Sequence, residues 1–242
     1  MRTTRVLIAL AALLVLAVPA FAQHGRGYGR HRNYGPEREG EFRIRVGAFQ
    51  PDGESDYWRD VNDEFTGSID DFENADFGAD YLLGLGNHLS LSFGGSVYEG
   101  DSTQAYRRFL DNNNDRIRHD TTLDIASGTV GLVYHVFGPG ATLQPYVGFG
   151  GGAYWWQIKE SGDFIDLGSP QRPIFNADLK SNGVAFGHYW LAGLQAPITR
   201  NVSLFAEGRW TSVKDNLKDD FEGFGDIDLG GREFAAGVSW RL

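Results

Sequence analysis

The chain of 242 residues has no cysteine, a single methionine, and no apolar run long enough to cross a membrane as a helix. The missing cysteine excludes disulfides, thiolate metal sites, a cysteine nucleophile and a lipid anchor on cysteine. The longest apolar run, residues 6–18, falls short of the ~18 residues that a membrane-spanning helix needs. Basic charge is also scarce, with 22 Lys and Arg against 32 Asp and Glu, and the formal net charge of −10 argues against a nucleic-acid partner.

The beginning of the chain has the pattern of a secretion signal. Arg2 and Arg5 precede the apolar run, and the small-residue sequence Ala20-Phe21-Ala22 follows it. This order is typical of a cleaved signal peptide, which we expect over residues 1–22. Residues 23–40 are rich in Gly, Arg and His without periodicity, and this composition predicts a flexible periplasmic leader.

The rest of the chain shows the alternation of strands. Its 33 glycines and 14% aromatic residues favour an all-β fold. Within the fourth alternating segment, the apolar parity changes near Ile125, which indicates either a β-bulge or the height at which the strand leaves a membrane. Segments in which apolar and polar residues alternate are found at 41–50, 76–86, 89–97, 121–137, 143–158, 182–196, 202–213 and 233–242.

The connections between these segments alternate strictly between short and long. The short ones are 86–88, 138–142 and 197–201, and the long, polar ones are 51–75, 100–120, 159–181 and 214–229. Outer-membrane barrels combine tight periplasmic turns with longer external loops, and their strands are only half apolar because every second residue faces the lumen. The sequence therefore predicts an eight-stranded antiparallel up-and-down transmembrane β-barrel over residues 41–242, in the cell outer membrane, with short periplasmic turns and long extracellular loops.

Two motifs resemble those of known outer-membrane proteins. The ending Gly237-x-x-Trp240-x-Leu242 resembles the C-terminal assembly signal that the barrel-assembly machinery reads, although the last residue is usually Phe. Residues 145–152, Pro-Tyr-Val-Gly-Phe-Gly-Gly-Gly, are similar to a strand of small OmpA-, OmpX- and OmpW-like barrels. The resemblance implies an outer-membrane barrel without the peptidoglycan-binding domain that follows the OmpA barrel. It also implies outer-membrane lipid and lipopolysaccharide as surroundings.

Several charged residues fall on the face that points into the barrel. The first and last strands are neighbours on closure, so we expect Arg43 or Arg45 to meet Glu207 and Glu233. Buried charges must pair, which predicts a structural plug of ion pairs, while an ion gate or polar relay stays open as the alternative. The predicted lumenal network comprises Arg43, Arg45, Asp80, Glu207, Arg209, Glu233 and Arg241.

The first and fourth long loops are strongly acidic. Clustered carboxylates are ligands of hard divalent cations, so these loops form either a cation site or simply a solvated surface. The segment 111–115 suggests a calcium loop but fails the EF-hand pattern, with Arg116 at position six and Thr122 at position twelve. No cofactor is expected. The acidic residues are Asp52, Glu54, Asp56, Asp60, Asp63, Glu64, Asp70, Asp71 and Glu73 in the first loop, and Asp215, Asp219, Asp220, Glu222, Asp226 and Asp228 in the fourth.

The sequence favours a non-catalytic role in envelope structure or surface contact. A narrow conduit for small hydrophobic molecules is the alternative, as the OmpW resemblance allows. A lipid A-modifying enzyme is the third hypothesis, and the sequence supports it least. His88-x-Ser90 lies beside a periplasmic turn, and His119 with Asp120 lacks a placed serine nucleophile. We therefore expect no catalytic residues.

Overall fold

The computed structural model describes residues 40–111, 113–138, 141–166 and 168–242. In these residues, eight strands close into an antiparallel barrel in the order β1-β10-β7-β6-β5-β4-β3-β2, which confirms the predicted fold class. No helix of the described residues has the length and apolar character to cross a membrane. The predicted signal peptide and leader lie outside the described residues, apart from Gly40, where the first strand begins.

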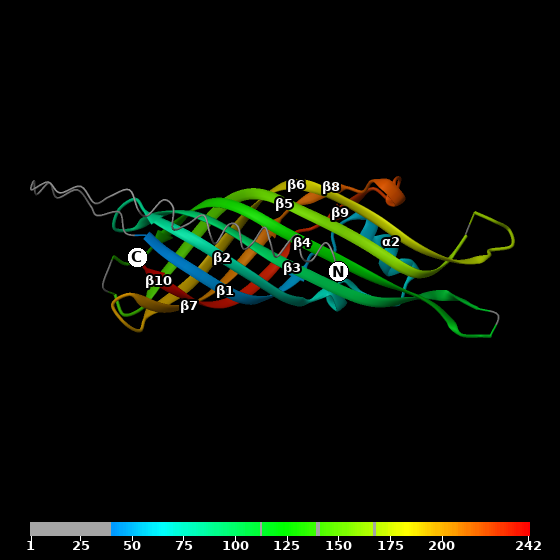
Figure 1. Ribbon diagram of the computed structural model, residues 1–242, viewed down its shortest axis with the longest axis horizontal. Coiled ribbons are helices and arrows are strands. Elements are labelled where there is room, and N and C mark those ends of the chain that lie inside the picture. The colour runs from blue at the N-terminus through cyan, green and yellow to red at the C-terminus, as the bar shows by residue number, and fades with distance from the viewer. Residues whose placement is uncertain (1–39, 112, 139–140, 167) are drawn as a thin grey trace, which may run out of the picture.

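The barrel strands alternate as the sequence predicts. In β1, Arg43 and Arg45 are buried while Ile44 and Val46 are exposed. The three short connections lie at the same end of the barrel as the C-terminus (Figure 1). The strands are β1 (Gly40–Pro51), β2 (Asn74–Gly84), β3 (Leu89–Leu110), β4 (Arg116–His135), β5 (Gln144–Ile165), β6 (Ile174–Pro197), β7 (Val202–Ser212) and β10 (Gly231–Arg241).

The first and last strands close the barrel along their whole length. Their register runs from Glu41 opposite Arg241 to Pro51 opposite Gly231. Near the periplasmic end, the rings of Phe42 and Trp240 stack with centroids 6.2 Å apart. The seam therefore has no unpaired edge strand within the barrel wall.

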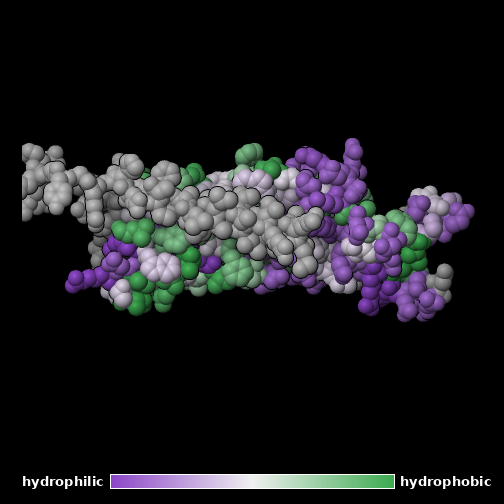
Figure 2. Space-filling view, in the orientation of Figure 1, coloured by the Kyte–Doolittle hydropathy of each residue, from purple (hydrophilic) through white to green (hydrophobic). Residues whose placement is uncertain are grey.

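The outward face of the barrel is apolar. Figure 2 shows hydrophobic residues over the barrel wall and hydrophilic residues gathered at its outer end. Such a band, with aromatic rings near its borders, is the lipid-facing surface of an outer-membrane barrel. Its exposed aromatic side chains include Phe77, Phe93, Phe149, Trp155, Phe186, Trp190, Trp210 and Phe234.

The prediction of long loops is wrong for two of the four connections. Residues 100–120 and 159–181 are mostly strand. Beyond Tyr98, β3 leaves β2 and continues to pair with β4, apart from an isolated bridge between Tyr106 and Phe65. From Ile174 to Gly187, β6 pairs with β5 and not with β7. The hairpins β3–β4 and β5–β6 therefore project outward from the barrel as a four-stranded sheet (Figure 1). We call residues 99–124 and 157–183, which lie beyond the outermost lipid-facing aromatic side chains, the extracellular extension.

The change of parity near Ile125 has a simple cause. The register of β4 with β3 and β5 runs unbroken from His119 to Tyr134, so the β-bulge alternative is wrong. The inward side chains Leu123 and Ile125 are apolar and buried, because here the strand leaves the membrane and its inner face packs against other residues. Below Ile125 the apolar residues of β4 therefore face the lipid, and from Ile125 outward they face the interior.

The other two long connections fold into a compact lid over the outer end, which we call the extracellular cap (residues 52–73 and 213–230). It contains α2 (Asp56–Glu64), η1 (Ile69–Phe72), β8 (Lys214–Asn216), η2 (Asp219–Phe221) and β9 (Asp226–Asp228). The side chain of Ser55 accepts a hydrogen bond from the Trp58 amide and so begins α2 as its N-cap. Strands β8 and β9 pair only with each other.

Candidate functional site: the lumen and its cap

The centre of the lumen holds a network of buried ion pairs around Arg45. The Arg45 guanidinium pairs with the Asp80 carboxylate, and its Nε lies 2.9 Å from Glu233 Oε1. A second guanidinium shares Asp80: Arg209 Nη2 lies 3.7 Å from Asp80 Oδ1 and 3.1 Å from Glu207 Oε1. The structure thus brings together five of the seven predicted network residues, from the neighbouring strands β2, β1, β10 and β7.

A glycine makes room for this network. Gly78 stands opposite Arg45 in the β1–β2 register, and a Cβ atom there would overlap the Arg45 guanidinium. The side chain of Arg45 can therefore cross over β2 to reach Asp80. This close approach explains a small residue on an inward position of β2.

The remaining two predicted residues lie nearer the periplasm. Arg43 does not pair with Glu207 or Glu233; its Nε donates to Glu41 Oε1 over 2.7 Å and its Nη2 to Gln195 Oε1 over 2.6 Å. The Arg43 guanidinium also lies 4.8 Å from the ring centroid of Tyr146. Arg241 stands opposite Glu41 at the rim and is partly exposed, rather than buried at the level of Asp80.

Sequence analysis missed Glu41 and Gln195. Gln195 is buried near the periplasmic end of β6, and its amide donates to the Ser239 hydroxyl over 3.2 Å. The alternation of β6 places Gln195 on the inward face, but an uncharged amide gives no sign in the sequence that it binds an arginine. Glu41 begins the predicted strand 41–50 and shares the inward parity of Arg43, so its parity was the available signal.

An apolar cluster fills the other side of the lumen. Tyr146 anchors it to the charged side, because its hydroxyl donates to Glu207 Oε2 over 2.9 Å. An eight-stranded barrel has an interior just wide enough for side chains to fill, and here ion pairs and this cluster fill it together. The cluster consists of Leu82, Val133, Tyr146, Tyr189 and Leu191.

The extracellular cap closes the outer end with a second hydrophobic core. Trp58 of α2 is fully buried, and its indole Nε1 donates to the carbonyl oxygen of Asp228 over 3.0 Å. Phe72 and the inward residues Leu123 and Ile158 of the extension are equally buried in this core. A solute entering from outside would therefore meet packed side chains before it reached the ion pairs.

A layer of polar side chains lies on the inner face of the extension, outside the membrane-spanning part. Glu160 is buried, and burial raises its pKa to about 7, although the hydrogen bond from the Tyr57 hydroxyl opposes this rise. Burial lowers the pKa of His119 to about 4. The His119 ring is enclosed by Phe65 and Phe164, at centroid distances of 4.5 and 5.1 Å.

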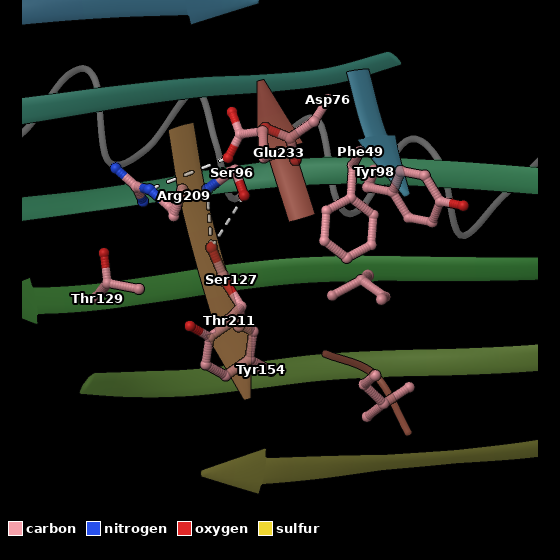
Figure 3. A pocket seen from close by; sticks show the side chains of 12 residues that line it. Phe49, Asp76, Ser96, Tyr98, Ser127, Thr129, Tyr154, Arg209, Thr211 and Glu233 are labelled. Atoms are coloured by element: carbon pink, nitrogen blue, oxygen red, sulfur yellow. Dashed lines mark hydrogen bonds and ion pairs between the residues drawn. The ribbon is translucent and has the colours of Figure 1, made fainter. Parts of the chain in front are cut away.

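A small cavity of about 30 Å³ remains between the ion-pair network and the cap (Figure 3). One side is polar and includes the Arg209 guanidinium beside Asp76, Ser96, Ser127, Thr129, Thr211 and Glu233. The other side is formed by aromatic and aliphatic residues below the cap. This volume is enough for a water molecule or a small ion, and too small for an organic ligand.

The acidic loops show no ready-made metal site, since no group of three or more His, Asp or Glu side chains in the described residues converges on one point. Asp111 instead stabilises its own turn, because its Oδ1 accepts hydrogen bonds from the amides of Asn113 and Asp115. In the described part of the chain, neither His88 nor His119 has a serine hydroxyl as a hydrogen-bond partner. These candidates supply no catalytic pair.

The closed barrel with its lipid-facing band defines an integral protein of the bacterial outer membrane. The family model described as "Outer membrane protein beta-barrel domain" matches residues 8–241, so the chain belongs to this family. No curated protein matches the chain.

Solved structures of small outer-membrane proteins are similar to this chain at low identity. Neisserial surface protein A is 14% identical, covers 84% of this chain and 97% of its own, and has a TM-score of 0.47. The attachment invasion locus protein Ail of Yersinia pestis is 15% identical, with 85% and 99% covered and a TM-score of 0.45. The outer membrane protease OmpT from Escherichia coli is 9% identical, with 88% and 99% covered and a TM-score of 0.44. The family match alone therefore carries the assignment.

Proposed function

We propose that this protein is a non-conducting barrel that holds a rigid platform above the outer membrane, for envelope structure or surface contact. The single observation that carries the proposal is the filled lumen, in which buried ion pairs and two apolar clusters leave only small spaces. A pore needs an open or easily opened path. Opening this one requires separating Arg45 from its carboxylates, which is costly in a low-dielectric interior.

The extension supports the surface-contact part of the proposal. Its strands continue the barrel wall directly, so it is held by sheet hydrogen bonds and not by a flexible linker. Leu110, Ile174 and Phe175 are exposed near the tips of its two hairpins, far from the lipid-facing band. Exposed apolar side chains on a rigid support are typical of contact surfaces.

The conduit hypothesis is less well supported. A lateral path for hydrophobic molecules needs a gap between strands, but every pair of neighbouring barrel strands is joined by a continuous register within the described membrane-spanning residues. An axial path would pass through the cap around Trp58.

The test is conductance and uptake by the purified, folded protein. Folding is first checked by heat-modifiability on a denaturing gel. We expect no channel steps in planar bilayers and no uptake of small hydrophobic molecules into vesicles. The variant Trp58→Ala combined with Arg45→Ala serves as a positive control for an opened lumen. Steady channel steps or uptake by the wild type would contradict the proposal, and a change in the mass spectrum of lipid A would favour the enzyme hypothesis.

A further inference from the structure

The lipid-facing wall carries a histidine where apolar residues are expected. His188 is exposed on β6 between Phe186 and Trp190, whose side chains are 80% and 60% exposed. The register of β6 with β5 runs unbroken through this position, so no β-bulge places the imidazole there. No hydrogen bond or ion pair within the described residues involves the His188 ring. A titratable side chain in the hydrocarbon layer needs a polar partner, and here its surroundings are lipid.

Two more polar residues lie beside His188 on the outer surface of the wall. Ser212 stands directly opposite His188 in the β6–β7 register. Arg232 stands opposite Trp210, two residues before Ser212, in the β7–β10 register. Both polar side chains are exposed, and Arg232 forms no ion pair within the described residues. From the usual spacing of strands and residues, the Cα atoms of His188 and Arg232 are roughly 12 Å apart.

The three polar residues lie at different depths. Ser212 is the last residue of β7 and Arg232 is the second of β10, so both lie where the wall meets the extracellular cap. His188 lies deeper, because β6 continues outward through Phe186 and Val184, which face the lipid. A positive charge at the border, with hydrogen-bonding groups below it, matches the phosphate of a lipid headgroup and the oxygens of its acyl chains.

A flat apolar surface begins next to His188. Gly151 stands opposite it on β5, and a Cβ atom there would meet only the carbonyl oxygen of Gly187, at 3.0 Å. On the periplasmic side of Gly151, the rings of Phe149 and Trp190 lie with their centroids 5.6 Å apart. An acyl chain can therefore lie close to the backbone beside these rings, where it gains dispersion contacts along its length.

We propose that this patch binds one phosphorylated lipid of the outer leaflet, with its phosphate on Arg232 and an acyl-chain oxygen on Ser212 and His188. The acyl chain then lies over Gly151. The chemistry commits to lipid A, whose acyl chains carry hydroxyl and ester oxygens below the phosphorylated sugar. A phospholipid has its ester oxygens only next to the headgroup, above the level of His188. This inference does not depend on whether the lumen conducts.

The test measures the binding of added lipid to the folded protein. The protein is refolded in detergent free of lipid A, and the temperature at which the folded band disappears is read in the heat-modifiability assay. Lipid A, dephosphorylated lipid A or phosphatidylglycerol is then added in mixed micelles, and the shift with lipid concentration gives an apparent Kd. We expect lipid A to bind most tightly and to raise the wild-type temperature most. Native mass spectrometry should show one lipid A per protein.

Four variants separate the lipid contacts from the fold. Arg232→Gln and His188→Leu should each weaken lipid A binding by roughly tenfold, as expected for the loss of one strong polar contact. His188→Gln keeps a hydrogen-bond donor and should bind more tightly than His188→Leu. Arg116→Gln, at the exposed outer end of β4, is the matched control and should bind as the wild type does. In lipid-free detergent all four should unfold at the wild-type temperature, since none of these side chains has a hydrogen-bond or ion-pair partner in the described residues.

Two results would overturn the proposal. The first is that lipid A binds the wild type no more tightly than phosphatidylglycerol does, which would mean that the patch is ordinary lipid-facing wall. The second is that Arg232→Gln and His188→Leu bind lipid A as tightly as Arg116→Gln does.

Discussion

The hydroxyl of Tyr57 in α2 donates a hydrogen bond to Glu160 Oε1 on β5 over 2.5 Å, and this contact joins the extracellular cap to the extension. Both side chains are buried, and no cationic side chain of the described residues forms an ion pair with Glu160. A carboxyl in this position is more stable when protonated, because burial penalises its charge. The attachment of the cap is therefore sensitive to pH.

The first prediction concerns Glu160→Gln. The pKa of this carboxyl is about 7 in the folded protein against 4.5 when it is unperturbed, so the folded state binds the proton more tightly. Its contribution to the stability of the cap is full below pH 4.5 and is lost as the pH rises to about 7, by about 3 kcal/mol. Glu160→Gln should remove this loss. The measurement is the urea midpoint of tryptophan fluorescence in detergent between pH 4 and 8, and a variant with unchanged pH dependence would contradict the assignment.

The second prediction concerns His119→Leu. The pKa of His119 is lowered from 6.5 to about 4, so the unfolded state binds its proton more tightly. Stability is full above pH 6.5 and is lost as the pH falls to about 4, which is opposite in sign to the effect of Glu160. The wild type should consequently change little between pH 4.5 and 6.5, whereas His119→Leu should become steadily less stable as the pH rises. Arg118→Gln, on the exposed face of the same strand, is the matched control.

The third prediction concerns Arg45→Met. Removal of this guanidinium leaves Asp80 and Glu233 without their closest cation, which should destabilise the barrel by roughly 3–5 kcal/mol. The temperature at which the folded band disappears in the heat-modifiability assay should fall. Arg232→Ala, on the exposed face of β10, should leave it unchanged. Adding Asp80→Leu to Arg45→Met should restore part of the loss; if it lowers the temperature further, the pairing is not what stabilises the lumen.

The fourth prediction concerns Gly237 in the motif that resembles an assembly signal. A Cβ atom at this position would lie 2.5 Å from Cζ of the Phe205 ring and would overlap the Ile44 carbonyl oxygen. Gly237→Ala should therefore slow or prevent the closure of β10 against β1 and β7. Gly86→Ala places its Cβ in open space and is the control. Equal yields of heat-modifiable protein from both variants would show that the seam tolerates the extra atom.

The barrel wall was predictable because lipid imposes a simple rule on it. Residues such as Ile44 and Val46 must be apolar and their neighbours Arg43 and Arg45 need not be, so the period of two is visible in the sequence. The sequence did not predict the outer ends of β3 to β6 as strands, because no lipid covers them and their outward residues need not be apolar. On these segments outward Asp120 and inward His119 are both polar, and the alternation disappears although the strand continues.

The site was predictable only in part. Charged residues on inward positions identified Arg45, Asp80, Glu207, Arg209 and Glu233, but parity alone did not give their partners. Asp76 begins the predicted strand 76–86, next to an acidic loop. One more carboxylate there did not indicate a buried residue. Its burial depends on the cap, and the cap is built from contacts between α2 and β9, such as the one between Trp58 and Asp228, that join distant parts of the chain.

The Trp58–Asp228 contact also implies an order of events during assembly. Residue 58 follows the first strand and residue 228 precedes the last, so the lid cannot lock until nearly the whole chain has been inserted. Packing of the cap core therefore comes late in assembly, although α2 follows directly after the first strand.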